Sequence, residues 1–144
     1  MLLTIAIMIL AYMIMGKDIS ALLARVKNIN WRRHLNKVWA YMRPWAVKVG
    51  RTTARPVLQC YYVLQDENTS TTDRLAIYAA IAYTVLPMDL IPRSVYKFFG
   101  VLDDGLAVMY IYRKIKDKIT PEINTKVEDT LNEWFGVEYE MVEG

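Results

Sequence analysis

The chain opens with an uninterrupted apolar run. Residues 1–15 carry no charge, and Thr4 and Tyr12 are their only polar side chains. A helix that is apolar on all sides is typical of a membrane segment or of a fully buried helix, and a chain of 144 residues is small for burying one completely. We therefore interpret residues 1–16 as a membrane-anchor helix, although a spanning helix needs about 17 apolar residues or more.

Residues 17–65 predict basic amphipathic helices. Between residues 18 and 42, apolar positions recur at three- and four-residue spacing, and lysine and arginine residues fill the opposite face. The asparagines of residues 28–30 indicate a break between two shorter helices. Pro44 predicts the start of a further helix, because proline suits the first helical turn and disfavours helix just before it. Pro56 then predicts a kink.

Residues 66–119 predict a helical hairpin that follows a polar loop. Ser70 stands three residues before Asp73, a spacing that is typical of a capping box at the start of a helix. Residues 74–86 then contain one charge, at their start, and residues 101–112 form a second apolar run that is interrupted only by Asp103, Asp104 and Gly105. Two apolar helices joined by a proline-containing turn are expected. They form either the core of a cytoplasmic helical domain or a partly embedded hairpin.

Residues 120–144 predict an amphipathic helix and an acidic tail. Thr120 and Pro121 are favoured at the N-cap and at the first helical position, and Gly136 suits the position just past the end. One apolar stripe lies between them, formed by Ile123, Val127, Leu131 and Trp134. With no strand-like alternation and no repeat, the predicted fold is all-α: an anchor helix followed by a small bundle around the central hairpin.

Histidine and cysteine are too few for several kinds of chemistry. Cys60 is the single cysteine, which excludes an internal disulfide framework and an all-cysteine metal site. His34 is the single histidine, and we interpret it as a solvated surface residue and Cys60 as a core side chain. The six glycines are isolated, so no phosphate-binding loop is present. The sequence therefore predicts a protein that is not an enzyme and that has no cofactor.

Charge is distributed unevenly, although the net charge is only +3. Residues 17–55 are rich in lysine and arginine with Asp18 as their single acid, whereas residues 122–144 are acidic apart from Lys126. Basic residues that follow an apolar anchor indicate the cytoplasmic side of a membrane, facing an anionic inner leaflet.

Aromatic residues between these cations leave a second interpretation of the basic segment open. Trp31, Trp39, Tyr41 and Trp45 would suit stacking on single-stranded nucleic acid, or they would lie at a membrane interface. Because an apolar segment precedes them, we favour lipid as the partner and expect no nucleic acid.

A distinctive motif joins the two arms of the hairpin. The sequence Pro87-Met88-Asp89-Leu90-Ile91-Pro92 is followed after a short linker by Gly100-Val101-Leu102-Asp103-Asp104. This pattern resembles that of the YkvA-like family, domain of unknown function 1232, over roughly residues 74–112. The resemblance implies a small helical bacterial protein, often membrane-associated, with no established activity. Arg93 departs from the family, which usually has an acidic residue there, and Leu86 stands where serine is common.

The motif carboxylates allow two interpretations. In the structural one, Asp89 caps backbone N–H groups in the turn, while Asp103 or Asp104 favours the start of the second helix. In the functional one, the three carboxylates converge on a cation, since hard cations prefer oxygen ligands. The candidate site residues are Pro87, Asp89, Leu90, Ile91, Pro92, Gly100, Asp103 and Asp104, and no metal is specified.

The sequence thus predicts a non-enzymatic interaction or regulatory module at the bacterial cytoplasmic membrane, with the bulk of the chain on the cytoplasmic side. Its basic helices and its acidic C-terminal helix offer complementary surfaces for self-association or for a protein partner. The alternative is an ion- or metal-handling membrane protein that uses Asp89, Asp103 and Asp104.

Overall fold

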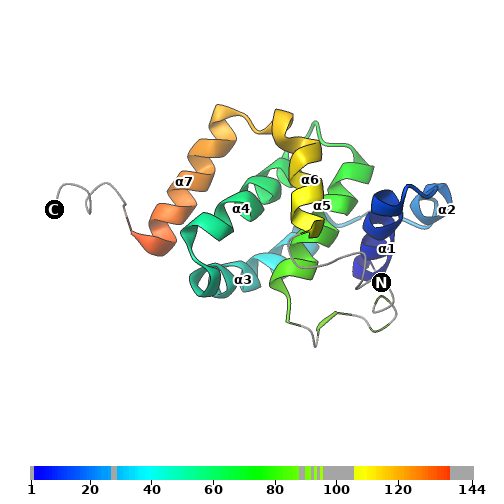
Figure 1. Cartoon of the computed structure of the whole chain (residues 1–144), viewed down its shortest axis with the longest axis horizontal. Coiled ribbons are helices and arrows are strands. Elements are labelled where there is room, and N and C mark those ends of the chain that lie inside the picture. The colour runs from blue at the N-terminus through cyan, green and yellow to red at the C-terminus, as the bar shows by residue number, and fades with distance from the viewer. Residues whose placement is uncertain are drawn as a thin grey trace.

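A computed structural model describes residues 2–26, 29–87, 90, 91, 93, 95 and 106–136 of the chain. These residues contain helices and no strand, in agreement with the predicted all-α class (Figure 1). In chain order the helices are α1 (Leu2–Met15), α2 (Ser20–Leu23), α3 (Trp31–Val49), α4 (Arg51–Gln65), α5 (Thr71–Val85), α6 (Leu106–Ile115), the 3-10 helix η3 (Lys116–Lys118) and α7 (Pro121–Phe135).

Helix α5 is the centre of the molecule. Every side chain from Leu75 to Ala82 is buried, because α1, α3, α4 and α6 all pack against this helix. In Figure 1, α6 lies in front of α5 and α1 lies beside it. A helix that is apolar on all sides has to be enclosed, and here four helices enclose it. The first arm of the predicted hairpin is therefore the core of the bundle.

Helix α1 differs from the expected anchor. It has 14 residues, and Ala6, Ile7, Ile9, Leu10 and Ala11 are completely buried, mainly through packing on α5. Among the helices of the described ranges, none is both long enough and apolar enough to cross a membrane. The anchor is expected because so small a chain offers little surface to bury an all-apolar helix. The apolar surface of α5 provides that surface, and α1 packs against it.

The predicted helix ends are confirmed by their hydrogen bonds. The Ser70 hydroxyl accepts from the Asp73 backbone N–H at 3.1 Å, and the Thr120 hydroxyl accepts from the Ile123 N–H at 3.2 Å. Gly136 follows α7 with a φ of +87°, a left-handed conformation that suits glycine at a helix C-terminus. Residues that cap a helix therefore mark the starts of α5 and α7 and the end of α7 along the chain.

The boundary predicted at Pro44 is wrong. Helix α3 continues through Pro44 to Val49 and ends at Gly50, whose φ is +97°. Proline inside a helix removes one hydrogen bond, to the carbonyl four residues earlier. Ala40 and Pro44 are both exposed, so water can satisfy that carbonyl. The break predicted at residues 28–30 is confirmed on its described side, since Asn30 caps α3 by accepting from the Arg33 N–H.

Helix α7 is attached to α4 by a seam with apolar and polar parts. Ile123, Val127 and Leu131 are buried in the common core. Glu128 accepts two hydrogen bonds from the Arg55 guanidinium, at 2.9 Å and 3.1 Å. The Tyr62 and Thr130 hydroxyls are joined at 2.8 Å. The apolar stripe therefore sets which face of α7 is buried, and the polar contacts fix its position along α4.

The aromatic residues of the basic segment pack within the protein. Trp39 lies against Tyr61, Tyr62 and Trp134, with ring centroids 4.9 Å, 6.5 Å and 5.4 Å away. Trp31 makes an edge contact with Tyr78 at 6.0 Å. Because such rings carry much of the apolar area that a small core buries, these side chains have a structural role in joining α3 to α4, α5 and α7.

Candidate functional site: an apolar groove with a basic end

The described part of the motif is a turn that follows α5. Pro87 is exposed, and its carbonyl accepts a hydrogen bond from the Leu90 N–H at 2.9 Å. Leu90 keeps 37% of its surface exposed, whereas Ile91 and Val95 are buried. Ile91 of the motif and Val95 of the linker that follows it thus pack against the core.

The remaining motif residues, Asp89, Pro92, Gly100, Asp103 and Asp104, lie outside the described residues. Whether their carboxylates converge on a cation therefore stays a prediction. Within the described ranges, no group of three or more histidine, cysteine, aspartate or glutamate side chains is arranged to hold a metal ion.

Cys60 occupies the core position expected for it. It lies in α4 with 1% of its surface exposed, and burial raises the pKa of its thiol to about 12. His34, in contrast, is not a freely solvated side chain. It is half-buried, with its ring 5.9 Å from that of Tyr78, and burial followed by the charge of Arg33 lowers its pKa. The raised pKa of the Cys60 thiol and the lowered pKa of the His34 ring both favour the neutral form of the side chain at neutral pH.

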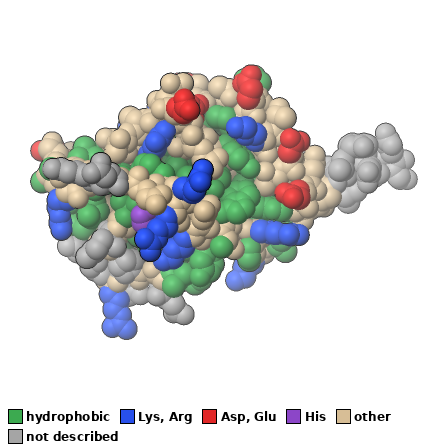
Figure 2. All heavy atoms as spheres, turned by 180° about the vertical axis from the view of Figure 1, so that it is seen from behind, with side chains coloured by type: hydrophobic (Ala, Val, Ile, Leu, Met, Phe, Trp, Pro, Cys, Tyr) green, Lys and Arg blue, Asp and Glu red, His purple; other side chains and the backbone are tan. Residues whose placement is uncertain are grey.

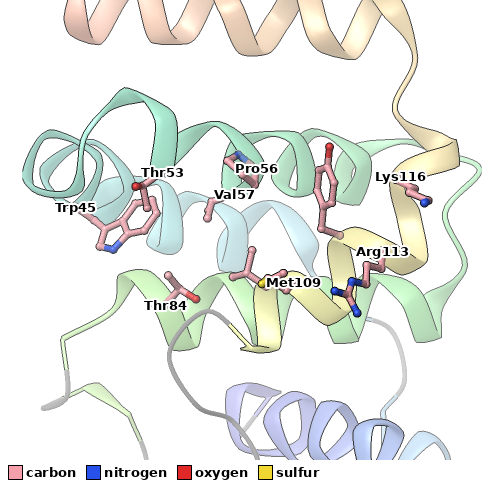
Figure 3. A pocket seen from close by; sticks show the side chains of 10 residues that line it. Trp45, Thr53, Pro56, Val57, Thr84, Met109, Arg113 and Lys116 are labelled. Atoms are coloured by element: carbon pink, nitrogen blue, oxygen red, sulfur yellow. The ribbon is translucent and has the colours of Figure 1, made fainter.

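An open groove lies between α4 and α6, with α5 beneath it (Figure 3). Its volume is about 530 Å³, within the usual range of roughly 300–1,000 Å³ for small-molecule sites. Val57 and Val108 are buried, and Pro56 and Met109 retain exposed surface beside them. The full lining is Trp45, Thr53, Pro56, Val57, Thr84, Val108, Met109, Tyr112, Arg113 and Lys116.

The two ends of this groove differ in chemistry. Figure 3 shows the Trp45 ring at one end and the Arg113 and Lys116 side chains at the other, with Val57 and Met109 between them. Both cations are exposed, and Arg113 belongs to the last turn of α6, where a positive charge is favourable. The groove is therefore amphipathic along its length.

A second hollow lies along α6 and shares two residues with the groove. It measures about 540 Å³ and is lined by Leu106, Met109, Tyr110, Arg113 and Lys114. Leu106 is 46% exposed and Met109 is 54% exposed. Large apolar side chains with adjacent cations on one exposed helix face are suited to contact with another molecule or a surface. We call the face formed by these five residues the α6 surface.

Neither the groove nor the α6 surface was among the candidate sites chosen from the sequence. The apolar run at residues 101–112 was interpreted as one hairpin arm. The signal in the sequence is that α6 has more apolar residues than the side facing the core can bury. Leu106 and Met109 stay exposed, whereas the buried residues are Ala107, Val108, Ile111 and Ile115. The groove itself had no sequence signal, because its lining comes from four separate segments.

Charge is separated over the rest of the surface. Figure 2 shows the face opposite to that of Figure 1, where Lys and Arg side chains are interspersed with hydrophobic ones and Asp and Glu gather mainly toward the top and right. Exposed basic residues of α3 are Arg32, Arg33, Lys37, Arg43 and Lys48, and exposed acidic residues of α7 are Glu122, Asp129 and Glu133. The charge asymmetry of the sequence is thus carried by different helices.

Comparison with known proteins gives one match. Residues 73–110 match a family model described as "Protein of unknown function (DUF1232)". The segment comprises most of α5, the motif and the first half of α6, and the match confirms the resemblance noted from the motif. Neither a curated protein nor a solved structure matches the chain.

Proposed function

Residues 73–110 match the DUF1232 family model, and from the surface that this segment helps to form we propose that the chain is a non-enzymatic, membrane-associated interaction module. It docks on anionic lipid through the α6 surface. The observation that carries the proposal is the exposure of Leu106 and Met109 beside Arg113 and Lys114. Apolar side chains that enter the interface, with cations that meet anionic headgroups, are the two elements of peripheral membrane binding.

Helix α1 offers a second apolar stripe next to the α6 surface. Ile5, Met8, Tyr12 and Met15 keep part of their surface exposed and recur at three- and four-residue spacing. Lys17 follows, with its Nζ atom 5.7 Å from the centre of the Tyr12 ring. The Tyr110 hydroxyl lies 3.5 Å from the Met13 carbonyl, so the end of α1 is close to α6. A second partly exposed apolar stripe close to α6 supports attachment to a bilayer surface.

The orientation in the proposal comes from charge. Arg113, Lys114 and Lys116 of α6 and η3, together with Lys17, match the anionic inner leaflet of a bacterial cytoplasmic membrane. The bulk of the chain then lies on the cytoplasmic side. The exposed cations of α3 and the exposed acids of α7 supply complementary surfaces for self-association or for a protein partner.

Cys60 supports the non-enzymatic part of the proposal. A nucleophilic cysteine needs access and a substantial thiolate fraction. Cys60 has neither, since it is 1% exposed and the pKa of its thiol is raised to about 12.

Vesicle sedimentation of the full-length chain tests the proposal. We expect binding to vesicles of phosphatidylglycerol and phosphatidylcholine, weak binding to phosphatidylcholine alone, and a decrease with added salt. The double variant Leu106→Ser/Met109→Ser removes the apolar contact and should weaken binding by about tenfold or more. The matched control is Val47→Ser, since Val47 is 59% exposed but lies on α3. Equal binding by the double variant and the wild type, or no binding to anionic vesicles, would overturn the proposal.

A further inference from the structure

We propose that the groove between α4 and α6 binds one molecule of a single-chain anionic amphiphile of the fatty-acid class. Its carboxylate lies at Arg113 and Lys116, and its hydrocarbon chain extends toward Trp45. This inference goes beyond docking on a bilayer surface, because it assigns a site for one monomeric ligand in the groove, which adjoins the α6 surface and shares Met109 and Arg113 with it.

The lining of the groove suits a hydrocarbon chain. Val57, Val108, Pro56 and Met109 present only apolar atoms. Thr84 also presents little polarity, since its hydroxyl donates to the Ala80 carbonyl within α5 at 2.8 Å. A peptide in this groove would leave most of its backbone N–H and C=O groups against apolar side chains, which is costly, because apart from Thr84 the hydrogen-bonding side chains of the lining are those of Trp45, Thr53, Tyr112, Arg113 and Lys116. An unbranched hydrocarbon chain carries no such groups.

The basic end suits a carboxylate. Arg113 and Lys116 are three residues apart and both line the groove. Among the described residues, none of the groove-lining side chains is acidic. The neighbouring Lys118 does not line the groove, and its Nζ atom is paired with the Asp73 carboxylate at 2.9 Å. Two cations at one end of an apolar groove favour an anion with a single long tail. A neutral amphiphile would gain the apolar contact but no charge-assisted hydrogen bonds.

Quenching of tryptophan fluorescence provides the test. The probe is stearate brominated at the middle of its chain, added to the full-length chain at concentrations where it stays monomeric. We expect saturable quenching at one probe per chain, and loss of most of that quenching in Trp45→Phe, because Trp45 lines the groove. The corresponding control is Trp39→Phe, since Trp39 packs against Trp134 and the tyrosines of α4.

Charge variants test the polar end. Lys116→Glu should weaken binding by about tenfold, because it replaces an attractive charge by a repulsive one. Lys126→Glu makes the same charge change on an exposed position of α7 and should leave binding unchanged. Stearyl alcohol, which lacks the charge, should compete poorly with the probe.

A groove-filling variant separates this inference from the proposed membrane function. Thr53 is exposed at the edge of the groove and does not belong to the α6 surface. Thr53→Phe should therefore abolish saturable quenching while vesicle sedimentation stays as in the wild type. The inference is overturned by quenching that does not saturate, that persists in Trp45→Phe, or that is equal in Lys116→Glu and Lys126→Glu, whatever the vesicle experiment shows.

Discussion

Cys60 lies on the side of α4 that faces the bundle, where 1% of its surface is exposed. Burial penalises the thiolate and raises the pKa to about 12, from an ordinary value of 9.0. We predict that a disulfide reagent such as dithionitrobenzoate reacts negligibly with the native chain near neutral pH and stoichiometrically with the chain in urea. Rapid reaction of the native protein would show that Cys60 is accessible and would contradict the buried position.

The same burial predicts the direction of alkaline unfolding. Tyr61 and Tyr78 also have pKa values raised to about 12 by burial, from 10.0. In the unfolded chain the thiol ionises above about pH 9 and the phenols above about pH 10, while the folded chain keeps all three protonated until about pH 12. The folded state therefore binds more protons in this range, so its stability falls as pH rises. Urea denaturation at pH 8 and pH 10.5 should show this loss, and Cys60→Ala should remove the part that begins near pH 9. An unfolding free energy that does not decrease over this range would contradict it.

At the scale of elements, polar side chains of α4 hold α7 in its position against the bundle. Arg55 binds both oxygens of Glu128, and Arg51 donates to the Asn132 side chain at 2.6 Å. The Glu128 side chain is 45% exposed, so solvent screens part of the interaction. We predict that Glu128→Ala lowers the unfolding free energy by about 1 kcal/mol, measured by urea denaturation.

Glu133 provides the control for this contact. It is exposed on the same helix, and its replacement by alanine removes the same side chain and the same charge as Glu128→Ala. Glu133→Ala should change stability by less than about 0.5 kcal/mol. Similar losses in the two variants would mean that net charge, and not the Arg55–Glu128 pair, determines the effect.

At the scale of the whole molecule, α1 joins the bundle instead of extending away from it. Leu10 is completely buried, and α1 packs extensively on α5. We predict that Leu10→Ala lowers the unfolding free energy by about 2–5 kcal/mol, the usual cost of removing a buried leucine side chain. Met8→Ala, at a half-buried position of the same helix, should cost clearly less. If α1 were outside the bundle, both variants would unfold like the wild type.

Much of the fold was predictable, since the decisive signals are local. Ser70 and Thr120 cap the helices that they were predicted to cap, and Gly136 ends α7. Pro44 failed as a boundary, because a single missing hydrogen bond on an exposed face is a smaller cost than ending a helix whose other face is buried. The resemblance to the DUF1232 family could also be seen in the sequence, because the motif lies in one continuous stretch, and the family model matches residues 73–110.

The sequence by itself determined the helical class, the helix caps, the apolar character of α5 and the resemblance of residues 73–110 to the DUF1232 family. Each of these depends on residues that are neighbours along the chain or on one helix face. Only the tertiary structure decided that α1 packs against α5, because an all-apolar helix suits protein and lipid equally well until a partner surface is known. It also decided the groove, whose Trp45, Val57 and Arg113 come from three helices and meet only once those helices have packed.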